Sequence, residues 1–338
     1  MITSTARARV VARIADHLAS RDPGHPLRVA VDGVTAAGKT TLARELTAAV
    51  AERGRPAAHL SMDGFHHPRA HRHRRGRDSA DGYYADAYDF AAVAREVLGP
   101  LGPGGDRRYR ERILDLRADT PVDEPPLTAA DDLVLVVDGS FLQRDLTWDE
   151  VVFVDTAFEV AKTRGTRRDA ELLGGAAEAA HTFEHRYHAA SRRYLAEANP
   201  VGRATVVVGN DDVAHPVLRR IGGPAGATAR LFSYGTLQLE AVQRERFGRV
   251  LAGEPDLLPG HRQDWVTITD PDVVAISGTD RHPIVRRTGD PADTTKGTVL
   301  TVTAEELAAA DVYEVDDYRR VLVALGSGPA WVYLAKTD

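Results

Sequence analysis

The chain has 338 residues, a net charge of −6 and no cysteine. This length favours two domains, and the composition is that of an ordinary soluble globular protein. The missing cysteine excludes disulfides, thiolate zinc sites and a cysteine nucleophile. The bulk charge does not suggest nucleic acid as a partner. No apolar run approaches ~18 residues and no apolar signal core follows the N-terminal arginines, so we expect a cytoplasmic protein without a membrane partner.

The first predicted elements lead into a phosphate-binding pattern. Val10, Ile14 and Leu18 form an apolar stripe that predicts a helix over residues 5–20. The apolar run 27–32 is typical of a buried parallel strand. Residues 33–41 then have the pattern G-x-x-x-x-G-K-T, and helix-forming residues follow. A Gly-rich turn before an amphipathic helix is the alternative, but the order of strand, loop and helix favours a P-loop.

Each fixed position of this P-loop has a chemical reason. Gly33 and Gly38 let the backbone curl so that its N–H groups approach phosphate oxygens. Lys39 supplies an ammonium for the β- and γ-phosphates, and Thr40 supplies a hydroxyl for Mg²⁺. The sequence therefore predicts ATP and Mg²⁺ as cofactors. The residues predicted to bind them are Gly33, Ala36, Ala37, Gly38, Lys39, Thr40, Thr41 and, after a later strand, Asn210.

A second strand is predicted over residues 57–63, ending in Asp63. Ligands of doubly wound sheets lie beyond the carboxyl ends of the strands, so Asp63 could accept a proton from a substrate hydroxyl near the γ-phosphate. A capping or turn aspartate is the alternative. The segment 66–77 carries four histidines and five arginines. A basic loop over phosphates or a solvated loop fits it better than a metal site, because it lacks the fixed spacing of zinc patterns.

Residues 81–90 contain polar aromatics that could line a small-molecule pocket, with Phe65, His66 and Tyr84 as candidate substrate contacts. The alternative is a helix start capped by Asp86 or Asp89. Residues 99–131 are rich in Gly, Pro and charge, and we expect them to be mostly irregular, with a hairpin around 109–116.

A continuous apolar strand is predicted over residues 133–137 and ends in Asp138, which has the form of a Walker-B acid that holds Mg²⁺ directly or through water. Another buried strand is predicted at 151–154. The helix expected from about residue 157 carries arginines that could stabilise a transferred phosphoryl group, with a solvated basic face as the alternative. His181, His185 and His188 are expected on the solvated face of the next helix, before a last strand at 204–208.

Together, these segments resemble the uridine kinase-like branch of P-loop kinases, which includes bacterial pantothenate kinase. The resemblance covers about residues 26–215 and rests on five segments: 33–41, 61–65, 86–89, 137–139 and 164–169. It implies that Asp63 is the catalytic base, that Asp138 is a Mg²⁺-associated acid, and that lid residues act on the phosphoryl group. The implied lid residues are Arg164, Arg167 and Arg168.

Two departures bear on the acceptor. Tyr83 stands near the position where uridine kinases carry an acid for the ribose hydroxyls. The motif Asp63-Gly64-Phe65 is also closer to that of pantothenate kinase than to that of a typical uridine kinase. The resemblance therefore implies phosphoryl transfer to a hydroxyl of a nucleoside-like or pantothenate-like molecule rather than to uridine in particular.

After a Gly-rich linker at 222–228, a small mixed α+β or barrel-like domain is predicted over residues 229–338. We expect a strand into a Gly turn at 229–237, a helix at 238–249, a short helix at 304–310, and strands. The strands are predicted at 264–269, 272–276, 297–302, 319–325 and 330–335. The turn offers N–H groups to a carboxylate or carbonyl oxygen, and Glu314 is a candidate acid/base, although Gly turns and solvated glutamates are common.

Residues 229–335 resemble the gamma-glutamylcyclotransferase-like family. The matching segments are Tyr234-Gly235-Thr236-Leu237, which corresponds to its substrate loop, and 297–300 through 311–319. The resemblance implies that Glu314 shuttles the proton while the substrate's α-amino group attacks its own γ-carbonyl, an amine leaves and 5-oxoproline forms. Val315 departs from the glycine that is often found after that glutamate.

The sequence thus predicts a P-loop kinase domain with a doubly wound parallel sheet over residues 1–221, fused to a gamma-glutamylcyclotransferase-like domain. We expect a small-molecule kinase with a second, cyclotransferase-like activity. One alternative keeps the kinase and makes the second domain a non-catalytic binding module. Another makes the P-loop a nucleotide sensor without an acceptor. Neither the acceptor nor the oligomeric state follows from the sequence.

Overall fold

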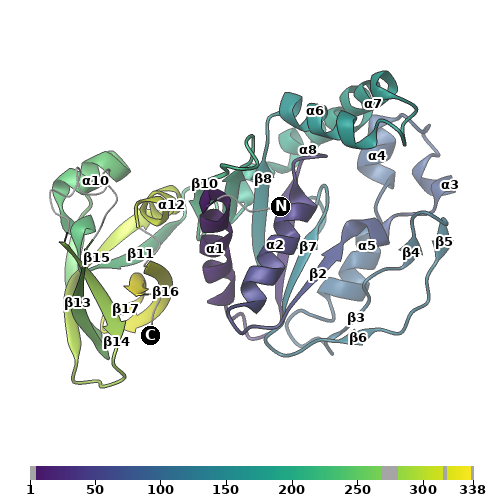
Figure 1. The fold of residues 1–338 in the computed structure, drawn as a ribbon. Coiled ribbons are helices and arrows are strands. Elements are labelled where there is room, and N and C mark those ends of the chain that lie inside the picture. The colour runs from purple at the N-terminus through teal and green to yellow at the C-terminus, as the bar shows by residue number, and fades with distance from the viewer. Residues whose placement is uncertain (1–4, 268–280, 315–317, 336–338) are drawn as a thin grey trace. The chain divides into compact units, whose positions relative to one another are not determined.

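The computed structural model describes residues 5–267, 281–314 and 318–335. The chain divides into two compact units, Met1–Val217 and Leu218–Asp338 (Figure 1). The predicted domain limits, 1–221 and 229–338, remain a proposal. Each unit has its own sheet and is described by itself below.

A six-stranded sheet with the order β10-β9-β8-β1-β7-β2 organises the first unit, although its edge strand β10 runs past the last residue of that unit, Val217. Neighbouring strands from β2 to β9 run parallel. The strand bounds are β1 Leu27–Gly33, β2 Ala57–Ser61, β7 Val134–Asp138, β8 Glu150–Asp155, β9 Val206–Gly209 and β10 Val217–Ile221. The register places Asp138 beside Val31 on one side and Ser61 on the other. The carboxyl ends of β1, β7 and β2 therefore meet at one edge.

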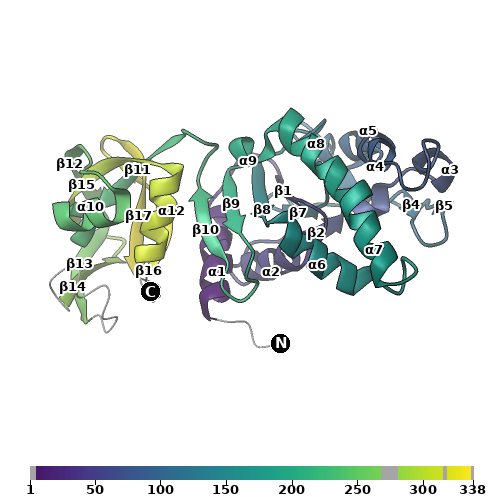
Figure 2. The same ribbon diagram turned by 90° about the horizontal axis from the view of Figure 1, so that it is seen from above.

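Helices cover both faces of this sheet (Figure 2). α1 and α2 pack together, and α2 contacts β1, β2 and β7. On the other face, Val93 and Tyr194 join Leu135 and Phe153 in one core. The helical bounds are α1 Thr5–Ala19, α2 Lys39–Ala51, η1 Met62–Phe65, α3 Arg69–Arg72, α4 Ala80–Asp86, α5 Phe90–Val93, η2 Ala94–Leu98, α6 Phe158–Asp169, α7 Ala176–Thr182, η3 Phe183–His188, α8 Ala189–Ala198 and α9 Pro200–Arg203. The doubly wound prediction is confirmed.

A buried ion pair fixes α1 to the start of β8. Glu150 is 3% exposed and lies 3.1 Å from His17 and 2.7 Å from Arg21. Burial alone would raise the pKa of Glu150, but His17, Thr205 and Arg21 outweigh it and lower the pKa to about 2. The carboxylate is therefore ionised over the whole neutral range.

Two local predictions in the first unit were wrong, namely the hairpin position and the solvated face of His188. The hairpin lies at β4 Leu114–Asp115 and β5 Thr120–Pro121 rather than at 109–116, because Asp115 accepts the N–H groups of the turn that follows it. The remaining short pair is β3 Arg108–Tyr109 with β6 Leu127–Thr128.

The helix start expected after Asp86 or Asp89 is confirmed at Asp89, which caps α5, whereas Asp86 ends α4 and binds two arginines. His188 is fully buried beside Phe158 and Phe183, so it does not lie on a solvated face.

A five-stranded mixed sheet with the order β12-β15-β11-β17-β16 forms the second unit, beside a two-stranded β13–β14 ribbon. The bounds are β11 Thr228–Ser233, η4 Thr236–Gln238, α10 Glu240–Phe247, β12 Gly253–Pro259, β13 His261–Thr267, β14 Arg281–Arg287, β15 Thr294–Thr303, α12 Ala304–Tyr313, β16 Tyr318–Leu325 and β17 Gly328–Ala335. The mixed α+β prediction is confirmed, although β10, β12 and β14 were not expected.

The strand predicted at 272–276 lies outside the described residues. Within the described ranges, no helix combines the length and the apolar character needed to cross a bilayer.

Candidate functional sites

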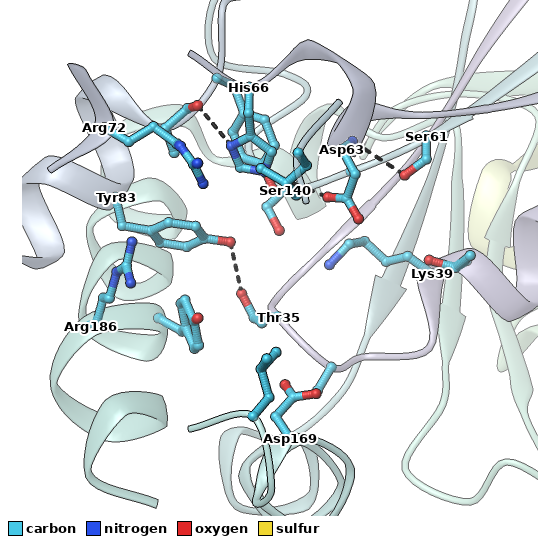
Figure 3. A pocket seen from close by; sticks show the side chains of 18 of the residues that line it. Thr35, Lys39, Ser61, Asp63, His66, Arg72, Tyr83, Ser140, Asp169 and Arg186 are labelled. Atoms are coloured by element: carbon cyan, nitrogen blue, oxygen red, sulfur yellow. Dashed lines mark hydrogen bonds and ion pairs between the residues drawn. The ribbon is translucent and has the colours of Figure 1, made fainter. Parts of the chain in front are cut away.

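A cavity of about 700 Å³ opens at the carboxyl ends of β1, β7 and β2 (Figure 3). Its lining includes Lys39 and Thr40 from the P-loop, Asp138 from β7, and Asp63 and His66 from the segment after β2. Segments that are distant in sequence therefore converge here because three parallel strands end side by side. The cavity brings together the predicted Mg²⁺-associated acid, the predicted base and three of the predicted phosphate-binding residues, Ala36, Lys39 and Thr40; Gly33, Ala37, Gly38 and Thr41 do not line it.

The P-loop backbone requires its two glycines. Gly38 has φ +101°, and a Cβ there would lie 2.7 Å from Nδ2 of Asn210. A Cβ on Gly33 would lie 2.6 Å from the carbonyl oxygen of Val154. Ala36 also has a positive φ, 67°, inside the loop. A loop in which residues of positive and negative φ alternate directs successive N–H groups into one concavity. Such a concavity suits an anion.

Lys39 lies within this loop rather than out in solvent. Its side chain is buried, and Nζ donates hydrogen bonds to the carbonyl oxygens of Gly33 (3.0 Å) and Val34 (2.8 Å). Burial lowers the pKa of Lys39 to about 8, although the Asp32 and Asp138 carboxylates oppose that shift. Because this pKa lies close to neutral pH, a phosphate bound beside Nζ would change the protonation of Lys39.

The residues available to Mg²⁺ are Thr40 and Asp138. The Thr40 hydroxyl donates to Oδ2 of Asp138 at 2.5 Å, and Nε2 of His59 lies 2.7 Å from Oδ1 of the same carboxylate. No group of three His, Asp or Glu side chains gathers as a metal site among the described residues. A hydroxyl and a carboxylate fit Mg²⁺, which takes oxygen ligands and commonly uses one or two protein groups with substrate phosphates and water.

Asp63 projects into the cavity from the one-turn helix η1. Ser61 caps η1 by accepting the N–H of Asp63, so the Asp63 carboxylate is not needed as the cap. The carboxylate is 69% exposed, and its Oδ1 lies 3.6 Å from Nε2 of His66. The His66 hydrogen bond and charge, with Lys39 and Arg168, lower the pKa of Asp63 against an opposing effect of burial. Asp63 is therefore ionised at neutral pH and able to accept a proton.

One wall of the cavity is aromatic, but it is not formed by all of the aromatics that the sequence singled out. Tyr83 and Tyr88 line the cavity, with Tyr187 from η3. The Tyr83 hydroxyl lies 3.3 Å from the Thr35 hydroxyl of the P-loop (Figure 3). His66 stacks on Tyr88, and its Nδ1 donates to the carbonyl of Ala87.

Phe65 and Tyr84 do not line this cavity. Phe65 is fully buried in the core, and the Tyr84 hydroxyl donates to Glu197 of α8 at 2.9 Å. Of the three predicted contacts in this unit, His66 lines the cavity, and Tyr83 lines it in place of its neighbour Tyr84, because adjacent residues on a helix point in different directions.

The three predicted lid arginines separate. Arg168 lines the cavity, paired with Asp169 at 2.7 Å. Arg164 instead donates to the carbonyl oxygens of Asn210 and Asp211, and Arg167 is exposed outside the cavity.

Asn210 is tied to the P-loop itself. Its Nδ2 donates to the Ala37 carbonyl at 2.8 Å, and its Oδ1 accepts from Arg7. Asn210 thus supports the loop from behind and does not line the cavity.

The structure also brings a basic group to the cavity, of which the sequence analysis singled out only the segment 66–77, as a loop over phosphates or a solvated loop: Arg69, Arg72, His73, Arg77 and Arg186. Four of these belong to the predicted basic segment 66–77. Arg186 comes from η3, more than a hundred residues later, so no local pattern could have joined it to them.

The second unit has a small cavity of about 20 Å³. Tyr234, Gly235, Thr236 and Leu237 line it together with Glu314, as the resemblance implied. The Thr236 hydroxyl accepts from Tyr313 at 3.1 Å, and the Tyr234 hydroxyl donates to the Tyr333 carbonyl at 2.5 Å. Burial, followed by the nearby Glu314 charge, raises the pKa of Tyr234 well above its usual value. Among the described residues this cavity has room for about one water molecule.

Comparison with known proteins finds relatives for both units. Residues 231–338 match the family model described as gamma-glutamyl cyclotransferase, AIG2-like. No curated protein matches the chain. A possible uridine kinase from Bacillus stearothermophilus is similar, with 23% identity, 60% of this chain and 97% of that chain covered, and a TM-score of 0.47.

A protein from Silicibacter sp. TM1040, named as a fructose transport system kinase, has 24% identity, with 56% of this chain and 94% of that chain covered, and a TM-score of 0.47. A gamma-glutamyl cyclotransferase structure has 17% identity, with 32% of this chain and 68% of that chain covered, and a TM-score of 0.26.

Proposed function

We propose that the first unit transfers the γ-phosphoryl group of ATP to a hydroxyl of a small molecule. The observation that carries the proposal is the exposed, ionised Asp63 in the same cavity as Lys39, Thr40 and Asp138. A carboxylate at that place can accept a hydrogen bond from the acceptor hydroxyl and then take its proton.

The reaction follows from these positions. The acceptor hydroxyl oxygen forms a bond to the γ-phosphorus while the bond to the β–γ bridging oxygen breaks, and ADP leaves. The hydroxyl proton passes to Asp63. Lys39 and Arg168 stabilise the charge on the phosphoryl oxygens, and Thr40 with Asp138 would hold Mg²⁺, which neutralises charge on the β- and γ-phosphates.

Phosphoryl transfer is tested directly with Mg²⁺-ATP and a panel of nucleosides, pantothenate, sugars and hydroxy acids, by following new phosphorylated masses. We expect a product from the wild-type protein, and a loss of at least about a hundredfold in rate in Asp63→Asn. Equal rates in the two proteins would contradict the role of Asp63. Nucleotide binding without any product would favour the sensor alternative.

For the second unit we propose a gamma-glutamylcyclotransferase-like activity on a γ-glutamyl amide or amine. It is supported by Glu314 and the 234–237 loop, which line one cavity, and by the family match of residues 231–338. Glu314 would accept a proton from the attacking α-amino group and return it to the leaving amine, while loop N–H groups hold the oxyanion.

Release of 5-oxoproline from a panel of γ-glutamyl amides tests this activity, with Glu314→Gln as the variant. We expect release by the wild-type protein and a loss of most of it in Glu314→Gln. A non-catalytic module would give the same small-molecule turnover in both proteins. A cavity of about 20 Å³ must enlarge to admit a glutamyl group, so we also expect a substrate analogue to change hydrogen exchange in the 234–237 loop.

A further inference from the structure

A group of basic side chains lines the P-loop cavity away from the phosphate-binding lysine. We call it the arginine cluster: Arg69, Arg72, His73, Arg77 and Arg186. Figure 3 shows Arg72 and Arg186 on the side of the cavity where Tyr83 lies, with Lys39 and Asp63 across from them. The cluster comes from two separate places, α3 with the segment after it, and η3. Two unrelated parts of the chain thus bring positive charge to one end of one cavity.

These charges are close enough to act on one another. Burial lowers the pKa of His73, and four guanidinium groups lower it further, in the order Arg186, Arg72, Arg77 and Arg69. Cations gathered in this way repel each other, and their proximity costs stability unless an anion offsets it.

The protein itself supplies little counter-charge. Arg72 pairs with Asp119 at 2.9 Å. Among the described residues, no ion pair joins a carboxylate to the guanidinium of Arg69, Arg77 or Arg186, although Asp119 also accepts the backbone N–H of Arg69 at 2.8 Å. Arg186 instead lies over the rings of Tyr83 (5.4 Å) and Tyr187 (5.3 Å).

Buried donors in the cluster also lack acceptors. Within the part of the chain that the structure describes, the Nε atoms of Arg72 and Arg186 are buried and have no hydrogen-bond partner. A buried donor without an acceptor is costly, so these side chains are held in place at the expense of stability.

Neighbouring arginines of the same segment behave differently. Arg74 and Arg75 both bind Asp86, at 2.5 Å and 2.8 Å, and so tether the segment to the end of α4. The arginines therefore divide into a tethering pair and a set that lines the cavity. The cavity's own acids have other partners or roles: Asp138 binds Thr40 and His59, Asp169 binds Arg168, and Asp63 lies beside His66.

We infer that the phosphoryl acceptor carries an oxyanion, a phosphate or a carboxylate, that the arginine cluster binds while Asp63 holds the acceptor hydroxyl. The inference rests on the proposed function, because only that function makes the bound ligand a phosphoryl acceptor. The groups that would bind the phosphates of ATP lie at the other end of the cavity. They are Lys39, Arg168 and the P-loop N–H groups. A guanidinium presents paired donors that match a phosphate or carboxylate, and Tyr83 and Tyr187 flank the space between.

The test fills the P-loop first and then measures binding of small anions. With Mg²⁺ and the non-transferable analogue AMP-PNP at saturation, inorganic phosphate and acetate are titrated by calorimetry at constant ionic strength. We expect saturable binding of at least one anion, and the stronger of the two identifies the acceptor's charged group as phosphate or carboxylate.

Arg186→Gln and Arg77→Gln should each weaken that binding by about tenfold or more, because each removes a charged donor. Within the described ranges, Arg77 has no hydrogen-bond or ion-pair partner whose loss would disturb folding. Arg95→Gln is the matched control: it removes an exposed arginine, paired with Glu96, outside the cavity. Unchanged AMP-PNP affinity shows that each variant is folded.

Three results would overturn the inference: no saturable anion binding, equal binding in Arg186→Gln, or a loss of AMP-PNP affinity in Arg77→Gln and Arg186→Gln with both proteins folded by circular dichroism. The last would assign the cluster to the nucleotide. Failure of the proposed function gives a different pattern, namely anion binding that depends on Arg186 but no transfer to any charged acceptor. Transfer to neutral acceptors alone, without anion binding, refutes the inference and leaves the kinase proposal intact.

Discussion

Nucleotide binding to the P-loop should take up a proton at Lys39. The Lys39 ammonium is buried, and its pKa is lowered to about 8 in the free protein. The phosphates of a nucleotide add negative charge beside Nζ and raise that pKa, so a protein that was partly deprotonated binds a proton together with the nucleotide.

The expected size follows from the pKa. At pH 8 about half of the free protein has neutral Lys39, so binding takes up about 0.5 proton; at pH 7 the figure is about 0.1. If the charged lysine alone binds phosphate well, the affinity falls by about twofold at pH 8 and about tenfold at pH 9 relative to pH 6. The sign is fixed: higher pH weakens binding.

Isothermal titration calorimetry at pH 8 measures this uptake, with Mg²⁺-ADP as the ligand and two buffers of different ionisation enthalpy. Mg²⁺-ADP is fully ionised at this pH, so its own phosphates contribute little. Lys39→Met should remove the uptake and weaken binding. An uptake near zero at pH 8, or the same uptake in Lys39→Met, would show that Lys39 does not change protonation when the nucleotide binds.

Three further predictions concern the frame around the site. Gly165→Ala would place a Cβ 2.0 Å from the Phe183 ring, so the free energy of unfolding measured in urea should fall by about 1–3 kcal/mol; an unchanged midpoint would contradict the packing of α6 on η3. Because the pKa of Glu150 is lowered to about 2, its contribution of about 3 kcal/mol is present above pH 4.5 and lost as pH falls toward 2; in Glu150→Gln, acid titration of stability should lack this component, and an identical acid profile would refute it. If His59 orients Asp138, His59→Leu should raise the Mg²⁺ concentration for half-maximal phosphoryl transfer by about tenfold at similar saturated rates, whereas unchanged Mg²⁺ dependence would mean that the contact is only structural.

The sequence predicted those features whose cause is local. The P-loop after β1 and the acid Asp138 that ends β7 each depend on a continuous apolar run and on the polar or glycine residue that closes it. Parallel strands end at one edge, so Lys39, Asp138 and Asp63 could be expected together before any coordinates. The match of residues 231–338 agrees with motifs of a few residues each in the second unit.

Whether a predicted side chain reaches the cavity depends on the face of the helix that its residue occupies. Tyr84 and Tyr83 are adjacent, but Tyr84 donates a hydrogen bond to Glu197 of α8, whereas Tyr83 lines the cavity. Of the α6 arginines, Arg168 reaches the cavity, whereas Arg164 reaches backbone carbonyls. Charge and polarity are the same in each pair, so sequence alone does not distinguish them.

Arg186 shows the same limit over a longer distance. Its place in the cavity depends on how η3, which continues α7, packs in the fold, and no spacing in the sequence encodes that position. Strands such as β12 Gly253–Pro259 were missed for another reason, because two prolines and alternating charge hide an edge strand that pairs with β15.

Phosphoryl transfer in Asp63→Asn measures the central claim most directly. The wild-type protein and the variant are incubated with Mg²⁺-ATP and the acceptor panel, which includes charged and neutral molecules. Phosphorylated products are followed by mass. The account predicts a phosphorylated product from the wild-type protein, and the loss of that product in Asp63→Asn with nucleotide affinity unchanged. A product formed equally by both proteins, or bound ATP with no product from any acceptor, would contradict it.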